Sequence, residues 1–239
     1  QQAGESAADL RTHIVVLEAK TGKTVRDATV SGIVLGQALT NSSLVVETAQ
    51  NYFPAGSGKG ILTTFSLTDA SAQPFSFPTD KWLVGATREN LVLAPNRLPD
   101  DCVYGCSLTT VSLVSTEGTT TKSVSGVTAV HPGGWIHRFA DPKAASALHL
   151  RSKAATEEER KAISSSWETL EQQLVNPSIM KTIDITGKDT FERGVPTGPG
   201  LLVKQEVPTG NGSTESKPAF WLSSADDGHP HTENLEQFT

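Results

Sequence analysis

The sequence lacks several features that would each assign it to a class of protein. Its 239 residues include only two cysteines and one methionine. No apolar run approaches the roughly 18 residues that a membrane-spanning helix requires. No stripe of Lys and Arg is present to neutralise phosphates, and the formal net charge is −6. We therefore expect neither a membrane span nor a nucleic-acid partner.

Complete catalytic motifs are also missing. The sequence has no Gly-x-Ser-x-Gly nucleophile elbow and no His-Glu-x-x-His metalloprotease helix. The glycine-rich stretch around Lys59 fails as a phosphate-binding loop, because Phe53 stands where the first glycine is needed and Gly60 replaces the Ser or Thr. These absences favour a non-enzymatic protein over an enzyme, although sites built from scattered residues escape such a search.

The abundant residue types predict short strands joined by turns. Ser and Thr are frequent, and 20 glycines and 13 prolines punctuate the chain. We expect a mainly β fold, a β-sandwich of Ig-like or prealbumin-like type. The strands expected in the first part of the chain are 13–17, 28–34, 44–48, 60–67, 82–86, 91–94, 107–115 and 121–130.

One region has helical character, and we expect a helical hairpin inserted at about residues 141–175. Asp141 is suited to cap a first helix that begins at Pro142. Thr156 and Glu159 have the spacing of a capping box for a second helix. An apolar stripe at helical spacing extends that helix to Asn176, where Pro177 ends it. The stripe consists of Ile163, Trp167, Leu170 and Leu174.

The expected organisation is a sandwich over residues 1–140, followed by the helical hairpin, additional strands and a polar tail over residues 141–239. Three further strand candidates lie in "MKTIDIT", "GLLVKQEV" and "KPAFWLS", and the stretch 187–200 between the first two is expected to be a loop. We expect the two parts to pack as one unit, with a split into two domains near Asp141 as the alternative.

The stretch "TGKTVRDATVSG" resembles the first hairpin of prealbumin-like and carboxypeptidase-regulatory-like β-sandwich domains. The resemblance covers about residues 12–36. It implies a β-sandwich with a strand, a tight turn and a second strand whose Ala28 packs inward. Such families serve as adhesion, binding and accessory modules, and they share no catalytic residues that could be transferred to this chain.

Three observations favour a secreted or periplasmic protein. The chain begins at Gln1 without an initiator Met, as a mature exported protein does. Asn41 and Asn211 lie in N-glycosylation acceptor triplets. Cys102 and Cys106 can close a small disulfide loop in an oxidising compartment. Redox chemistry and metal binding are the less favoured alternatives for these cysteines.

Histidines are the candidate metal ligands. In "VHPGGWIHRFADP", His131 and His137 are expected to be a turn residue and a strand residue, and only a folded glycine turn would bring them together. Near the C-terminus, His229 and His231 accompany Asp227, a set that suits Zn or Cu(II). His149 is expected to be a surface or boundary residue. No cofactor is expected, with Zn or Cu as the alternative.

Function is therefore narrowed to three hypotheses. The leading one is an exported, non-enzymatic binding or structural subunit with protein partners, either as an oligomer or in a hetero-assembly. The second is a metal-binding secreted protein that uses the histidines above. The third is a carbohydrate-binding module with exposed tryptophans, although core positions are the expected places for Trp82, Trp135, Trp167 and Trp221.

Overall fold

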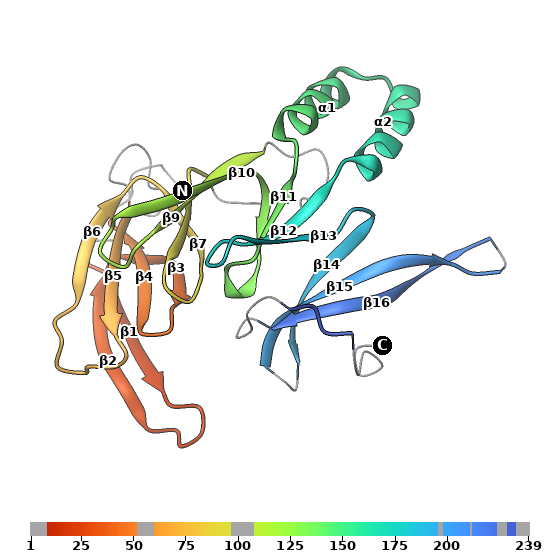
Figure 1. Cartoon of the computed structure of the whole chain (residues 1–239). Helices are drawn as coiled ribbons and strands as arrows, with labels where there is room; N and C mark the ends of the chain where they lie inside the picture. The colour runs from red at the N-terminus through yellow and green to blue at the C-terminus, as the bar shows by residue number, and fades with distance from the viewer. Residues whose placement is uncertain are drawn as a thin grey trace. The chain divides into compact units, whose positions relative to one another are not determined.

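The structure is a computed structural model of the chain, and it describes residues 9–51, 60–96, 108–195, 198–210, 212–223 and 229–232. The described chain is mainly β, as predicted, with one helical hairpin (Figure 1). The strands are β1 (Arg11–Leu17), β2 (Thr24–Ser31), β3 (Ile33–Leu39), β4 (Ser43–Ala49), β5 (Gly60–Ser66), β6 (Phe75–Thr79), β7 (Trp82–Ala86), β8 (Leu91–Ala94), β9 (Thr109–Val114), β10 (Thr120–Val130), β11 (Ile136–Phe139), β12 (Gln172–Asn176), β13 (Lys181–Asp184), β14 (Lys188–Val195), β15 (Gly198–Pro208) and β16 (Thr214–Ser223).

These strands form four antiparallel sheets. Their strand orders are β1-β2, β3-β4-β5-β6, β13-β12-β11-β10-β9-β8-β7 and β14-β15-β16. The chain divides into two compact units, Gln1–Arg97 with Val111–Ser123 and Leu98–Thr110 with Val124–Thr239. None of the helices in the described part of the chain is both long enough and apolar enough to cross a membrane.

The first unit is a β-sandwich. Its core is formed by apolar side chains of the β3–β6 sheet, Val45 and Leu62, and of the facing strands, Leu83, Leu93 and Val114. All five side chains are buried. Each buried aliphatic side chain contributes about 2 kcal/mol through the apolar area removed from water, and this term holds the two sheets together.

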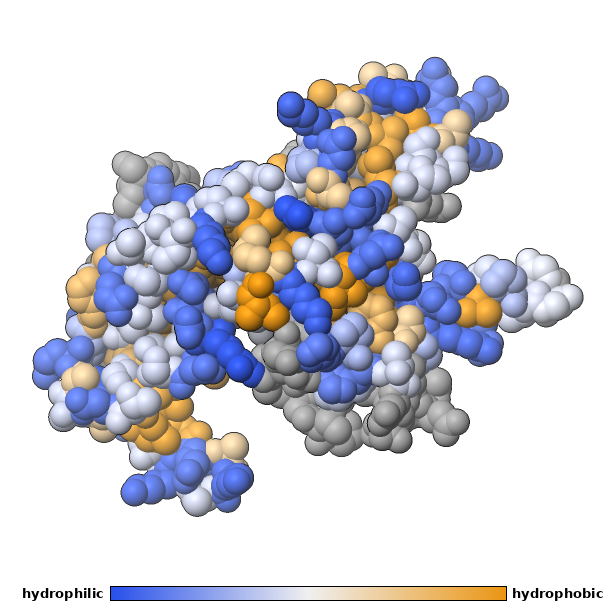
Figure 2. Space-filling model, in the orientation of Figure 1, coloured by the Kyte–Doolittle hydropathy of each residue, from blue (hydrophilic) through white to orange (hydrophobic). Residues whose placement is uncertain are grey.

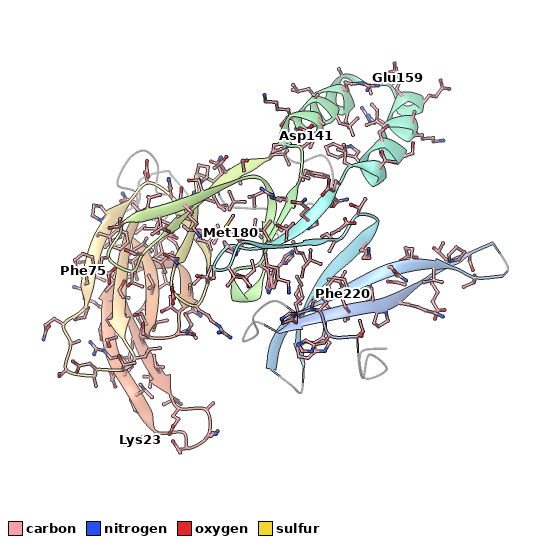
Figure 3. All side chains as sticks on the ribbon, in the orientation of Figure 1. Lys23, Phe75, Asp141, Glu159, Met180 and Phe220 are labelled. Carbon is pink, nitrogen blue, oxygen red and sulfur yellow. The ribbon has the colours of Figure 1, made fainter. Side chains whose placement is uncertain are left out.

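A third layer covers part of the outer face of the sandwich. The β1–β2 hairpin packs Ile14, Val16 and Val30 against Leu44 and Phe65 of the β3–β6 sheet. All seven residues of β4 are buried, because this strand has a layer on each side. The hairpin itself alternates between exposed and half-buried positions along β1, as expected for a strand with one face in water. Lys23 marks its tip in Figure 3.

The predicted second strand, 28–34, is wrong in one respect. β2 ends at Ser31, and Ile33 already belongs to β3. Gly32 separates them with a φ of 91°, a conformation that side chains other than glycine rarely adopt. A Cβ atom at this position would lie 2.4 Å from the backbone oxygen of Ala49. The chain therefore changes layers at this glycine.

A carboxylate links the two sheets of the sandwich. Glu47 on β4 is fully buried, and its Oε2 accepts a hydrogen bond from the backbone N–H of Leu83 on β7, at 2.9 Å. A Cβ atom on Gly36 would lie 3.5 Å from Oε2, and one on Gly60 would lie 3.0 Å from Oε1. Glycines on both neighbouring strands therefore leave room for this side chain.

The second unit combines strands with the helical hairpin. β12 pairs with β11 on one side and with β13 on the other. Trp135, Leu174 and Ile185 pack against Leu201 and Phe220 of the β14–β16 sheet. The core of this unit therefore lies between the strands β11–β13 and the sheet β14–β16.

Helices α1 (Pro142–Ala154) and α2 (Glu157–Thr169) confirm the predicted hairpin and its caps. The Asp141 side chain accepts hydrogen bonds from two backbone N–H groups of α1. Thr156 and Glu159 form the reciprocal capping box, and Figure 3 shows Asp141 and Glu159 near the beginnings of the two helices. Hydrophobic residues gather between the helices in Figure 2, where Ile163 and Trp167 belong to one buried cluster with Phe139.

Two boundaries in this unit were predicted wrongly. α2 ends at Thr169, and Leu174 lies in β12. This residue pairs with His137 and Ile183 on the neighbouring strands and is fully buried, so strand pairing overrides the helical spacing. The stretch 187–200, expected to be a loop, contains β14 and the beginning of β15. β6 in the first unit was not predicted.

Candidate functional site

The glycine turn brings His131 and His137 together. Pro132–Gly134 form one 3-10 turn between β10 and β11, with φ values of 76° and 77° at Gly133 and Gly134. The two imidazole rings stack with their centroids 6.1 Å apart. The expected roles are confirmed, since His131 precedes the turn and His137 is a residue of β11 that pairs with Ala129 and Leu174.

Burial decides the chemistry of His137. Its side chain is 4% exposed, and desolvation is the main cause that lowers its pKa to about 4. A hydrogen bond to Gln172 opposes this effect, and the nearby His131 lowers the pKa further. The Nε2–H of the neutral ring donates to Gln172 Oε1 at 2.9 Å. At neutral pH His137 is therefore an uncharged group that links β11 to β12.

The C-terminal histidines make other contacts within the second unit. The backbone groups of His231 and Trp221 exchange two hydrogen bonds, of 2.8 and 2.9 Å, so His231 forms an isolated antiparallel β-bridge beside β16. The rings of His231 and Trp221 stack at 4.8 Å. His229 Nδ1 lies 3.2 Å from Lys181 Nζ, from which it accepts a hydrogen bond when the imidazole is neutral.

The predicted metal ligands therefore fall into two separate groups. His131 and His137 form a stacked pair, and His229 and His231 lie in the C-terminal segment that bridges to β16. Among the residues that the structure describes, no three His, Cys, Asp or Glu side chains form a group that could hold a metal ion. Asp227 lies outside the described residues. His149, expected to be a surface or boundary residue, is instead buried on α1 at 8% exposure, and neither of its ring nitrogens has a hydrogen-bond partner among the described residues.

The other predicted sites have different outcomes. Cys102, Cys106 and Asn211 lie outside the described residues, so the disulfide and the second glycosylation site stay predictions. Asn41 is exposed in the turn between β3 and β4. Trp135 and Trp167 are buried at 1% and 4% exposure, which confirms their expected places in the core, whereas Trp82 and Trp221 are only half-buried.

Sequence reasoning missed a groove on the outer face of the first unit. It encloses about 330 Å³ between β2 and the uncovered part of the β3–β6 sheet. Its polar side chains carry hydroxyl or carboxamide groups, and its floor is apolar. The lining residues are Thr29, Val30, Ser31, Thr48, Gln50, Ile61, Thr63, Phe65, Pro74 and Ser76. In a chain so rich in Ser and Thr, no local pattern distinguishes these residues.

A projecting ribbon was missed as well. β14 pairs with β15 only as far as Gln205, so the last residues of β15 pair with β16 alone. Nearly all side chains of this distal part are exposed.

We found no significant match of the chain to any protein family, curated protein or solved structure.

Proposed function

We propose that the protein is an exported, non-enzymatic subunit that binds other proteins in an extracellular or periplasmic assembly. The observation that carries the proposal is the distal ribbon, which we define as residues 206–208 of β15 with residues 214–216 of β16. In Figure 1 the ribbon extends away from the rest of its sheet.

Apart from the pairing of its two strands and the bonds in its turn, the ribbon gains little packing from the described residues of its unit. Its pairs are Glu206 with Ser216, Val207 with Glu215 and Pro208 with Thr214. Only Val207 is partly buried among these six residues, and Figure 2 shows the ribbon as mainly polar. A two-stranded ribbon without a hydrophobic face is at best marginally stable in water. Contact with a partner would supply the missing packing.

The β1–β2 hairpin supports the same function. On its outward face Val15 and Leu17 are 47% and 54% exposed. They are adjacent on one side of β1, because alternate residues of a strand share a face. These two side chains give the hairpin a small apolar contact surface for a partner.

Export has a separate observation in its favour. Asn41 is exposed in the turn between β3 and β4, and N-linked glycans are attached at exposed positions. Mass spectrometry of the protein from its native source tests this point. We expect a glycan mass on the peptide that contains Asn41 and its loss in Asn41→Gln. An unmodified Asn41 in protein from a eukaryotic source would remove this support.

The assembly proposal is tested by shortening the ribbon. Residues 206–216 are replaced by Asn-Gly, which joins Gln205 to Lys217 through a two-residue turn that antiparallel strands favour. Sedimentation velocity and cross-linking with mass spectrometry are applied to both forms in native extract. We expect the intact protein to sediment as an assembly with cross-links from Lys217, and the shortened form to sediment as a monomer.

A turn substitution elsewhere controls for nonspecific effects. Glu117→Gln alters the exposed turn between β9 and β10 and leaves the ribbon intact, so it should assemble like the intact protein. If the intact protein sediments as a monomer and forms no cross-link to another chain, the proposed function is wrong.

A further inference from the structure

The β1–β2 hairpin covers only part of the sheet beneath it. Burial on the outer face decreases across the sheet, from Thr48 on β4, which is buried, through Thr63 on β5, which is half-buried, to Ser76 on β6, which is exposed. The groove of about 330 Å³ lies where the edge of β2 meets this uncovered surface of the sheet. That volume lies within the usual range of small-molecule sites.

The groove differs in its charge from two other grooves of the described chain. A second groove is lined by Asp80 and Lys81, and a third by Arg151 and Glu159. Among the described residues that line the groove beside β2, none is charged. Its polar groups are hydroxyls and one carboxamide, and each of them can both donate and accept hydrogen bonds.

Several of these groups are available to a ligand. Thr63 Oγ1 and Ser76 Oγ lie 3.0 Å apart and bond to each other, which leaves further donor and acceptor capacity on both. The side chains of Thr29, Ser31 and Gln50 are exposed and make no hydrogen bond with any part of the chain described here.

The backbone of β2 adds further polar groups. Gly32 N–H donates to Leu10 O, which makes these two residues a hydrogen-bonded pair of the antiparallel ladder. Because such pairs alternate, Val30 faces β1 with its backbone, and the backbone groups of Thr29 and Ser31 point to the opposite edge. No strand pairs with that edge among the described residues.

We propose that this groove binds a short, neutral oligosaccharide. The hydroxyls of a sugar match side chains that both donate and accept, and the C–H faces of its rings match the apolar surface of Ile61 and Pro74. An acidic sugar would lose its hydration without meeting a cation in the groove. The proposal is independent of the assembly function, because the ribbon belongs to the other unit.

An extended peptide is the competing ligand, since it could add to the β2 edge. Only Thr29, Val30 and Ser31 of β2 line the groove. Three residues span about 10 Å, which is shorter than a typical strand of five or six residues. The dimensions of the groove therefore favour a compact ligand over an added strand.

The test uses the full chain labelled with ¹⁵N and a panel of defined probes. The neutral probes are maltotriose, cellotriose, xylotriose, mannotriose and triacetylchitotriose; the acidic probe is trigalacturonic acid, and the peptide probe is acetylated and amidated TVTVT. We expect at least one neutral trisaccharide to shift the amide signals of Thr29, Ser31 and Ser76 in a saturable manner. Trigalacturonic acid and the peptide should leave these signals unchanged.

Variants that keep the shape of the side chain locate the site. Thr29→Val and Thr63→Val each remove one hydroxyl, and each should weaken trisaccharide binding about two- to tenfold. Thr24→Val is the matched control, because Thr24 is exposed on the same strand and does not line the groove. Circular dichroism and thermal unfolding verify that all three variants are folded.

Each possible result of the binding experiment either supports or overturns the proposed oligosaccharide site. Binding of a neutral trisaccharide that weakens in Thr29→Val and Thr63→Val, but not in Thr24→Val, supports the proposal. Binding that is equal in all three variants places the sugar elsewhere and overturns it. Binding of the peptide alone, of trigalacturonic acid alone, or of no probe also overturns it. None of these results depends on the ribbon, so failure here leaves the assembly function standing.

Discussion

Acidification should destabilise the strands around His137. This imidazole is buried and neutral in the folded protein, with a pKa of about 4, whereas its ordinary value is 6.5. Between these values the unfolded chain binds a proton that the folded chain does not. The stability that the neutral imidazole of His137 contributes is therefore fully present above about pH 6.5 and is lost as the pH falls towards about 4.

The magnitude follows from the difference between the two pKa values. A difference of about 2.5 units corresponds to about 3 kcal/mol once both states have been titrated. At about pH 5 the loss should already be about 2 kcal/mol. Because the side chain is 4% exposed, solvent screening reduces this value little. Such a loss is a large part of the stability of an ordinary domain.

Hydrogen exchange followed by mass spectrometry measures the effect locally. The free energy of opening of β11 and β12 is determined at several pH values from about 7.5 to about 4.5, after correction for the intrinsic exchange rate. His137→Asn cannot be protonated in this pH range, so this variant should lose about 2 to 3 kcal/mol less than the unaltered protein over the range. The direct check is an NMR titration of the His137 ring, with a midpoint near 4.

His13 provides the matched control. It is exposed and its Nε2 forms a hydrogen bond with Asp27 Oδ1 at 2.6 Å, and exposed contacts of this kind contribute at most about 1 kcal/mol. His13→Asn should therefore lose stability with falling pH much as the unaltered protein does. If His137→Asn shows the same pH dependence as the unaltered protein, or the ring titrates near 6.5, the reasoning from burial is refuted.

Further substitutions test the fold. Gly32→Ala should cost at least about 2 kcal/mol in thermal unfolding, because the position combines a φ of 91° with a backbone oxygen 2.4 Å from the new Cβ. Gly22→Ala has a φ of 68° but open space, so it should cost about 1 kcal/mol, and equal losses would contradict the steric argument. Thr156→Ala should cost about 1 kcal/mol in urea unfolding and Thr156→Ser much less, unless the capping box contributes nothing. Arg26 donates to three backbone carbonyl groups of residues 69–72, so Arg26→Lys should speed proteolysis of that loop, and an unchanged rate would refute its anchoring role.

The helix beginnings could be predicted because their causes are local. Asp141 and Thr156 satisfy backbone N–H groups two or three residues ahead, and this geometry depends on little else in the chain. The strands 82–86 and 91–94 were predicted to the residue for a similar reason. Each is a short run of apolar residues between turn residues, and the two pair with each other.

The end of α2 could not be predicted from spacing. The stripe continues to Leu174, yet residues 172–176 gain more from pairing on both sides with β11 and β13 than from one further helical turn. β14 was missed for the same reason, since its Gly- and Pro-rich surroundings look like a loop until β15 is present to pair with it. Pairing between distant segments has no signature within either segment.

The composition alone determined the fold class. Many turn residues and short apolar runs favour antiparallel strands, and the structure is mainly β with one helical hairpin. The sequence alone also identified the histidines as unusual, but only tertiary structure decided their chemistry. His137 is held neutral by the strands around it, while His231 forms a single β-bridge with Trp221 of β16. The groove beside β2 likewise exists only because one layer covers part of another, and no single segment encodes that overlap.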